Sequence, residues 1–386
     1  MNYKEFFRNT VILLGSTMSV MAGASIAPAL PEMTDYFSEV ENAEILVKIM
    51  LTIPSLFIAL FSPVAGIILD KYGRRLPLLL STILYGIAGT SGFYLDNLYL
   101  ILLGRAILGV SVAFIMSGYI TVIGDLFKGN QLNKFMGLQA AFMSFGGVVF
   151  LSISGLLADI SWNYPFLIYL FAFIIFIPLY LFLYETKQDL NTIERKKLFV
   201  AGVFKDVIYI YAIAFFSMAV FLIIPVQLPF LLKNNSEISN TNIGLLMSLW
   251  IFCSALTSIF YKKVKSQFSF INIFIIAFII WGIGHLILAY GDNFWEISIA
   301  LILAGIGNGL ALPNNKVLLI DSIDFEYRGR AVGILTMSFY FGQFFSPILF
   351  TLIMYKSSLT YGFIVSSFLL FVISILLIIL KKRVKM

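Results

Sequence analysis

Long apolar runs recur along this chain and are separated by short polar stretches. A helix needs about 20 mostly apolar residues to cross roughly 30 Å of hydrocarbon, and the runs have this length. They are continuous and do not alternate between polar and apolar residues, so they predict membrane-spanning helices and not the strands of a barrel. The connections are too short for a soluble domain. The predicted spans lie near 10–31, 45–69, 76–95, 98–124, 135–157, 165–184, 206–232, 243–261, 268–290, 295–320, 330–355 and 361–380.

Basic residues lie almost entirely on one side of this series of spans. When the connections are numbered from the N-terminus, the even ones and both tails hold nearly all Lys and Arg residues, whereas the odd ones hold only Lys233 and Lys356. Basic residues are retained in the cytoplasm during insertion, which predicts two cytoplasmic termini and an even number of spans. We therefore expect an all-α, multi-pass protein of the cell (inner or plasma) membrane, with twelve transmembrane helices.

Composition agrees with a protein whose partner is the lipid bilayer. Of 386 residues, 60% are hydrophobic and only 12% charged, against about 25% charged in soluble domains. The formal net charge of +6 comes from the basic connections, where it orients the chain and meets anionic lipid. This charge therefore does not indicate a nucleic-acid partner.

The spans divide into two groups of six that resemble each other. We expect an N-terminal bundle over 1–184, a cytoplasmic linker over 185–205 and a C-terminal bundle over 206–386. A shift of 196 residues superimposes identical residues of the two halves, most of them small or acidic, without a gap. These matches are Gly109 on Gly305, Asp125 on Asp321, Gly137 on Gly333, Phe145 on Phe341 and Gly146 on Gly342. Repeated halves of this kind are a transporter design in which the substrate binds between them near the midplane.

The connection between the second and third spans carries the most specific motif of the chain. It reads Gly66-x-x-x-Asp70-x-x-Gly73-Arg74-Arg75. Gly66 allows neighbouring helices to approach closely, and Gly73 permits a tight reversal. Asp70 is expected near the positive end of a helix while Arg74 pairs with an acid, which makes a breakable cytoplasmic latch. The alternative is a positively charged turn that only enforces topology.

This motif resembles the signature loop of the major facilitator superfamily, and helix count, orientation and half-repeat are similar over the whole chain. The resemblance implies that Asp70 and Arg74 join Asp125, at the end of the fourth span, to stabilise the outward-facing state. The corresponding second-half loop, 261–265, is basic but lacks the Gly-Asp-Gly framework.

Arg105 lies inside the fourth predicted span, in an Arg-x-x-x-Gly pattern with Gly109. An arginine at the centre of a spanning helix costs about 2.5–3.5 kcal/mol on insertion scales, so an arginine without a role is improbable. The alternative is a side chain that snorkels to the interface. The pattern is similar to the superfamily's fourth-helix motif, whose arginine is linked to proton coupling. We therefore take Arg105 as a proton-coupling candidate.

The end of the first span narrows the resemblance to the twelve-helix drug:proton antiporters. A Pro28-x-x-Pro31 pair closes this span, as a similar pair does in drug-exporting members of the superfamily. Glu32 follows directly and is a second proton-coupling candidate, with Lys48 as a possible partner. Both prolines have the simpler interpretation of kinking or ending the helix, and Glu32 that of a solvated surface acid.

The fifth span departs from the antiporter pattern. Its ending, Gly-Leu-Leu-Ala-Asp over 155–159, matches that pattern. However, Phe150, Leu151 and Ser154 stand where Gly, Pro and Gly are expected. This departure weakens the prediction of export by antiport and leaves the fold prediction unchanged.

Polar residues at depth suggest where a substrate cavity lies, because lipid cannot satisfy them. The tenth span is unusually polar; Asn308 is the main substrate-contact candidate, and Lys316 is close enough to the cytoplasmic end to snorkel. His285, the only histidine, is interpreted as a packed residue near the end of the ninth span. Further candidates for the cavity lining are Gln139, Gln227, Trp250, Tyr340 and Gln343.

These observations together favour a secondary active transporter that moves a small organic solute, works as a monomer and exports its substrate in exchange for protons. The alternative is a proton-coupled carrier, exporter or importer, of one endogenous metabolite or siderophore, and a transport-inactive sensor is a third hypothesis. No Walker-type phosphate loop is present, and one histidine with one cysteine, Cys253, leaves little for catalysis. We therefore expect no enzyme activity, no cofactor and no metal.

Overall fold

The computed structural model describes residues 3–185, 207–235, 238–324, 327–354 and 358–383. Within these residues, twelve helical segments are long and apolar enough to cross a membrane. The predicted all-α fold with twelve spans is thus confirmed. The predicted linker lies almost entirely outside the described residues.

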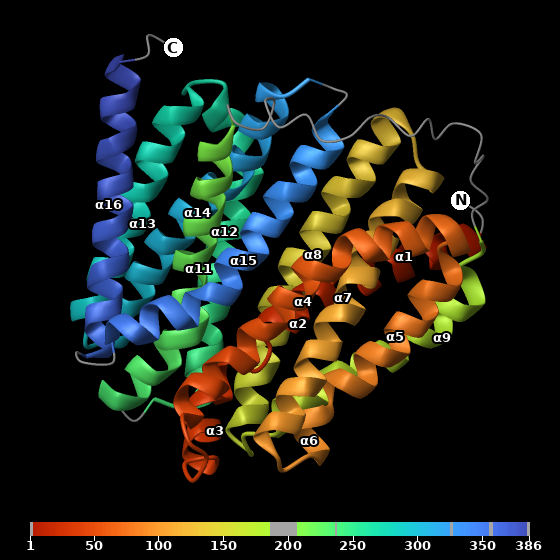
Figure 1. Cartoon of the computed structure of the whole chain (residues 1–386), viewed down its shortest axis with the longest axis horizontal. Coiled ribbons are helices and arrows are strands. Elements are labelled where there is room, and N and C mark those ends of the chain that lie inside the picture. Colours follow the sequence, from red (N-terminus) through yellow and green to blue (C-terminus); the bar gives the residue numbers. More distant parts are fainter. Residues whose placement is uncertain (1–2, 186–206, 236–237, 325–326, 355–357, 384–386) are drawn as a thin grey trace.

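The first six spans form one half, on the right of Figure 1. Their elements are α1 (Tyr3–Ser16), α2 (Met18–Ala24), η1 (Ala27–Ala29), α3 (Leu30–Tyr36), α4 (Ala43–Tyr72), α5 (Arg75–Gly89), α6 (Ser91–Tyr94), α7 (Leu98–Leu126), α8 (Gly129–Ala158), η2 (Tyr164–Leu170) and α9 (Phe171–Phe182).

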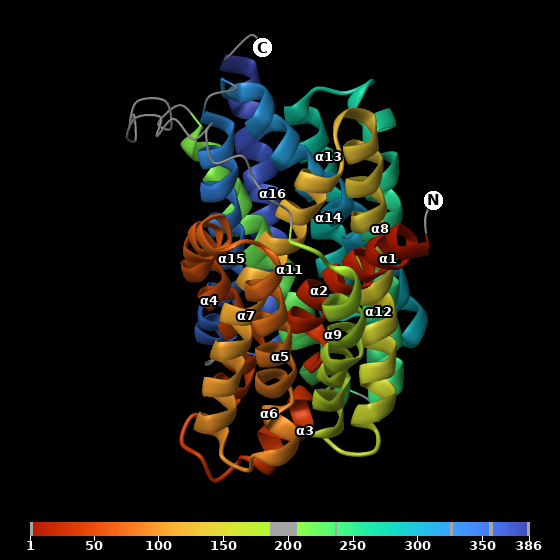
Figure 2. The same cartoon turned by 90° about the vertical axis from the view of Figure 1, so that its right-hand side faces the viewer.

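The last six spans form the other half, on the left of Figure 1. Their elements are α11 (Ile208–Asn235), α12 (Asn240–Lys265), α13 (Phe270–Tyr290), α14 (Phe294–Ser322), α15 (Arg328–Met354) and α16 (Leu359–Arg383). We call the end of the bundle at which α9 ends and α11 begins the linker end, and the opposite end, where α3 and α6 lie, the far end (Figures 1 and 2).

The first span is a broken helix, although the sequence predicted a continuous one over 10–31. It passes from α2 through the 3-10 turn η1 into α3, because Pro28 has no backbone N–H and cannot continue an α-helix. The break frees carbonyl groups that lipid cannot satisfy. Side chains from neighbouring helices bond to this segment: Ser154 donates to the Ser25 carbonyl, and Tyr85 Oη donates to the Met18 carbonyl at 2.7 Å.

The two halves repeat each other in their contacts as well as in sequence. A Cβ atom at Gly109 of α7 would lie 2.5 Å from the Pro54 carbonyl oxygen of α4, and one at Gly305 of α14 would lie 2.7 Å from the Trp250 carbonyl oxygen of α12. Both members of the second pair lie 196 residues after those of the first, which is the shift that relates the two sequences. In each half the glycine lets a central helix pack directly on its neighbour's backbone.

The halves meet mainly along two helix pairs, α8 with α12 and α4 with α15, and η1 and α3 also contact the second half. Toward the far end, Ser152 and Ser248 share a hydrogen bond of 2.9 Å, and a Cβ atom at Gly155 would lie only 2.5 Å from the Asn240 carbonyl oxygen. Toward the linker end, a cavity of about 410 Å³ lies between α8 and α12, lined from both sides by residues such as Ser144 and Ser258. The α8–α12 seam is therefore closed at the far end and open at the linker end.

Candidate functional site

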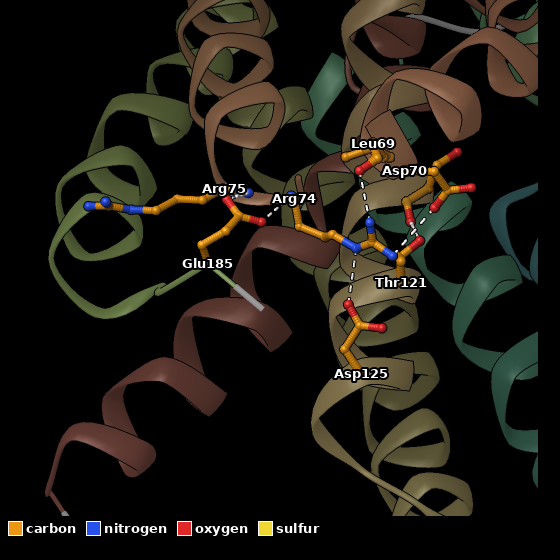
Figure 3. Close-up of polar contacts among 8 residues, drawn as sticks. Leu69, Asp70, Arg74, Arg75, Thr121, Asp125 and Glu185 are labelled. Carbon is orange, nitrogen blue, oxygen red and sulfur yellow. Dashed lines mark hydrogen bonds and ion pairs between the residues drawn. The ribbon is translucent and has the colours of Figure 1, made fainter. Parts of the chain in front are cut away.

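Arg74 is the centre of a buried polar cluster at the linker end of the first half (Figure 3). Its side chain is only 2% exposed, and Nε donates to Asp125 Oδ2 at 3.0 Å. Nη1 donates to the Leu69 carbonyl at 2.8 Å, and Nη2 lies 3.4 Å from Asp70 Oδ1. The three residues that the signature loop implied are thus brought together, and the guanidinium joins α4 to α7.

The two motif glycines differ in what surrounds them. Gly73 has φ of +84°, a left-handed conformation that favours glycine, and it reverses the chain between α4 and α5. A Cβ atom at Gly66 would meet nothing within 4 Å. The close helix approach expected at Gly66 is therefore absent from this structure.

Glu185, which the sequence analysis missed, sits on this loop. Its carboxylate accepts the backbone N–H groups of Arg74 at 2.6 Å and Arg75 at 3.1 Å, and it occupies the space that a Cβ atom on Gly73 would fill. The Arg75 side chain instead donates to the Tyr180 carbonyl at 2.9 Å. A lone Glu more than 100 residues away in sequence gives no signal of such a contact. Only the fold brings it to the start of α5.

The second half has a neutral cluster where the first has ion pairs. Tyr261 Oη, at the linker end of α12, donates to Asn314 Oδ1 of α14 at 3.0 Å. Asn314 Nδ2 in turn donates to the Phe270 carbonyl at 3.0 Å. This arrangement ties α12 and α14 to the start of α13 without a charge, which explains how a loop lacking the Gly-Asp-Gly framework still holds its helices.

Arg105 is completely buried and does not snorkel. Nε donates to the Met50 carbonyl at 3.0 Å, Nη1 to Tyr169 Oη at 2.5 Å and Nη2 to the Ala22 carbonyl at 2.7 Å. These three acceptors are two main-chain carbonyl groups and one phenol oxygen, and none of them is a carboxylate. The guanidinium joins α2, α4 and η2 to its own helix α7, and it satisfies one of the carbonyl groups of the broken first span.

Glu32 and Lys48 lie at the far end, but their suggested pairing is wrong. Lys48 Nζ lies 2.5 Å from Glu44 Oε1, one turn earlier on α4, and 4.7 Å from the centroid of the Phe230 ring of α11. Glu32 Oε1 instead lies 2.8 Å from Nζ of Lys233 in α11. Sequence spacing favoured the nearer lysine, whereas the contact between halves supplies the actual partner. Glu32, Glu44 and Lys233 line a far-end cavity of about 770 Å³.

Three of the side chains that the sequence predicted to line the substrate cavity form hydrogen bonds near the middle of the molecule. Tyr340 Oη contacts Met116 Sδ across the halves at 2.9 Å, and Gln343 Oε1 accepts from Ser55 Oγ, also across the halves, at 2.8 Å. Gln139 Nε2 donates to a serine hydroxyl of α1 at 2.8 Å. These side chains line the contact between helices, not the large far-end cavity.

The other three candidates, all in the second half, keep a buried polar atom without a hydrogen-bond partner in the described part of the chain. These atoms are Trp250 Nε1, Asn308 Oδ1 and Gln227 Oε1. Trp250 packs on Phe221 of α11 at 4.5 Å between ring centroids, and Asn308 Nδ2 donates to Ser254 Oγ of α12 at 2.9 Å. A buried polar atom without a hydrogen-bond partner costs free energy of folding, so its presence needs an explanation other than stability.

His285 is a packed residue, as the sequence analysis interpreted it. Nε2 accepts from Trp281 Nε1 at 3.0 Å, and Nδ1 lies 2.6 Å from Ser366 Oγ, whose own proton goes to the Phe363 carbonyl at 2.9 Å. Indole nitrogen only donates, so this network assigns the neutral ring with its proton on Nδ1. Lys316, by contrast, is exposed, with Nζ 6.0 Å from the Phe339 ring centroid.

Comparison with known proteins identifies the family. The model of the Major Facilitator Superfamily matches residues 12–234 and 210–385. Tetracycline resistance protein, class H, from Pasteurella multocida is 24% identical over 371 residues, covering 91% of this chain and 90% of that protein. The bacillibactin exporter of Bacillus subtilis (strain 168) is 26% identical over 363 residues, covering 89% of each.

A solved structure has the same fold. The bacterial homologue of the human lysosomal transporter Spinster is 14% identical, with a TM-score of 0.79, and covers 99% of this chain and 98% of that one. Together with the twelve spans, these matches make the protein a multi-pass membrane protein. The chain belongs to the Major Facilitator Superfamily and is a transporter, not an enzyme.

Proposed function

We propose that this transporter exports a small organic solute from the cytoplasm by alternating access, in exchange for protons. The observation that carries the proposal is the α8–α12 seam between the halves, which is closed at the far end and open at the linker end. A carrier that rocks about a central site passes through such a state before it opens on the other side. The basic residues of the even connections support a cytoplasmic linker end.

The glycines on the facing helices support the rocking motion. Gly137 of α8 and Gly333 of α15 are 196 residues apart, and a Cβ atom on either would meet nothing within 4 Å. Gly66 of α4 has the same open surroundings. Small residues allow close helix packing, so we assign these three to the contact that forms when the linker end closes.

The substrate site in this proposal lies in the second half, where Trp250, Asn308 and Gln227 carry unpaired polar atoms. One is a donor and two are acceptors, which suits a neutral or amphipathic solute that supplies both kinds of group. Gln139, Tyr340 and Gln343 complete the lining from the two halves. The names of the two sequence relatives, one a resistance protein and one an exporter, support efflux as the direction.

Protons drive the cycle in this proposal. Glu32, which lines the far-end cavity and is 31% exposed, is the group placed to exchange protons with the outside. Arg105 has no carboxylate partner among the described residues, so its role is to hold the broken first span in position and not to carry the proton itself.

Flux in membrane vesicles tests this function. Inverted vesicles that contain the protein should accumulate ethidium or tetracycline when respiration makes their interior acidic, and a protonophore should abolish the accumulation. Vesicles with Glu32→Gln should lose proton-driven uptake, whereas the matched control Asp292→Asn, an exposed residue at the same end, should not. Accumulation only in right-side-out vesicles would favour the importer. Absence of flux with these probes and with a siderophore in both orientations would contradict the proposal.

A further inference from the structure

The first half caps a helix of the second half at the far end. Asp159 follows the last residue of α8, and its carboxylate accepts the backbone N–H of Asn240 at 2.7 Å and of Thr241 at 3.1 Å. The Thr241 hydroxyl also contacts this carboxylate. Asn240 and Thr241 are the first two residues of α12, which belongs to the other half.

Asp159 supplies what the local sequence of α12 does not. The first N–H groups of a helix have no partner within it and carry a partial positive charge. Ser239 caps the third position, since its hydroxyl accepts from Asn242 N at 3.3 Å. Asp159 takes the first two positions and adds a negative charge to the positive end of a 26-residue helix.

Two glycines make this contact possible. A Cβ atom on Gly155 would lie 2.5 Å from the Asn240 carbonyl oxygen, and one on Gly244 would lie 2.6 Å from the Leu151 carbonyl oxygen. The backbones of α8 and α12 therefore touch directly over this stretch. The carboxylate at the end of α8 consequently reaches the start of α12 without an intervening side chain.

The Glu32–Lys233 ion pair between the halves at this end has the same polarity as the Asp159 cap. Glu32 of the first half lies 2.8 Å from Lys233 of the second, so the first half again supplies the acceptor and the second the donor. The Glu32–Lys233 pair is 31% exposed on each side, which makes it the weaker of the two contacts. Asp159 bonds two main-chain N–H groups of a fixed helix end, and this geometry needs no long side chain to be ordered.

We propose that Asp159 is the residue that holds the far end closed, and that it must release the start of α12 each time the far end opens. It acts as a positioning residue for solute release and does not contact the solute. This inference rests on the proposed alternating access, but not on which solute is carried or on proton coupling. When the cap breaks, α12 loses two charge-assisted hydrogen bonds, so the closed state is favoured while Asp159 is in place.

A single-cysteine reporter tests this inference. In a Cys253→Ser background, which removes the only native cysteine, Ser152→Cys places a thiol in the seam just inside the cap. A membrane-impermeant maleimide added from the far side reaches this thiol only when the far end is open. The labelling rate in right-side-out vesicles therefore reports the far-end opening.

Loss of the cap should raise the labelling rate. We expect an increase of about five- to tenfold for Asp159→Ala, which is the size of effect that the loss of one helix cap produces, and a smaller increase for Asp159→Asn. Gly155→Ala, which wedges α8 from α12, should also raise the rate. Asp292→Asn, an exposed acid at the same end, is the matched control and should leave the rate unchanged.

A purely structural cap would behave differently. In that case Asp159→Ala would lower the midpoint of thermal unfolding, but the labelling rate would equal that of the reporter protein that keeps Asp159. This result would overturn the inference. No labelling in any variant, Gly155→Ala included, would overturn it as well. Failure of the proposed function is distinguishable, because it appears as absent solute flux in the vesicle assay, whereas the labelling experiment requires no solute.

Discussion

The Arg74 cluster allows a prediction in which two acids of one motif have unequal effects. Asp125→Asn keeps the shape of the side chain but removes the charge beside a guanidinium that is 2% exposed. Removing one partner of a buried ion pair costs about 3–5 kcal/mol. The Asp125 side chain is 20% exposed, and an amide oxygen still accepts from Nε, so we expect about 2 kcal/mol, within the range for a hydrogen bond to a charged group.

Asp70→Asn should cost far less. Asp70 is 51% exposed and lies 3.4 Å from Arg74, and exposed ion pairs are worth about 0–1 kcal/mol. The two substitutions should therefore differ by about tenfold in the unfolding equilibrium. Although Asp70 has the more recognisable place in the motif, burial makes Asp125 the stronger partner of Arg74.

Unfolding by denaturing detergent in mixed micelles measures both variants against the parent protein. At about 1 M salt, where the screening length falls to about 3 Å, the effect of Asp70→Asn should vanish and that of Asp125→Asn should remain. A loss of stability for Asp70→Asn that equals or exceeds that of Asp125→Asn would refute the reasoning, because burial would then not decide the strength of the pairs.

Four further predictions follow from particular contacts. Arg105→Lys should abolish flux and lower thermal stability, because one ammonium group cannot reach three acceptors on three elements; wild-type flux would contradict this. Glu32→Lys or Lys233→Glu alone should increase the far-end labelling rate, and the double variant that exchanges the two charges should restore it. A double variant that labels as fast as the single ones would show that the contact is incidental. Gly137→Leu should leave the unfolding midpoint within about 1 °C but block flux, since the space beside Gly137 is empty in this structure and closes in the proposed cycle. His285→Gln should leave the pH profile of flux unchanged while lowering the unfolding midpoint, because the ring is buried and neutral.

The sequence by itself determined the architecture of this protein. Apolar runs of membrane length determine the number of spans, because every backbone polar group in hydrocarbon must be satisfied within a helix. The loop motif predicted that Arg74 pairs with an acid, and the family resemblance implied which acids these are; in the structure Arg74 lies beside Asp70 and Asp125. The contact with Asp70 is local, because the two residues are four apart across a short connection, whereas Asp125 lies 51 residues away and was implied only by the resemblance.

Contacts between distant segments were decided only by the tertiary structure. The sequence suggested Lys48 as the partner of Glu32, but the partner is Lys233, on the other half of the molecule. Nothing in the sequence indicated that Glu185 bonds to the signature loop, and the motif that ends in Asp159 did not indicate that its carboxylate bonds to the start of α12. The physical reason is the same in each case. Apolar spans pack through shape and small residues, so their sequences do not record which helices meet, and a polar side chain takes the partner that this packing places beside it.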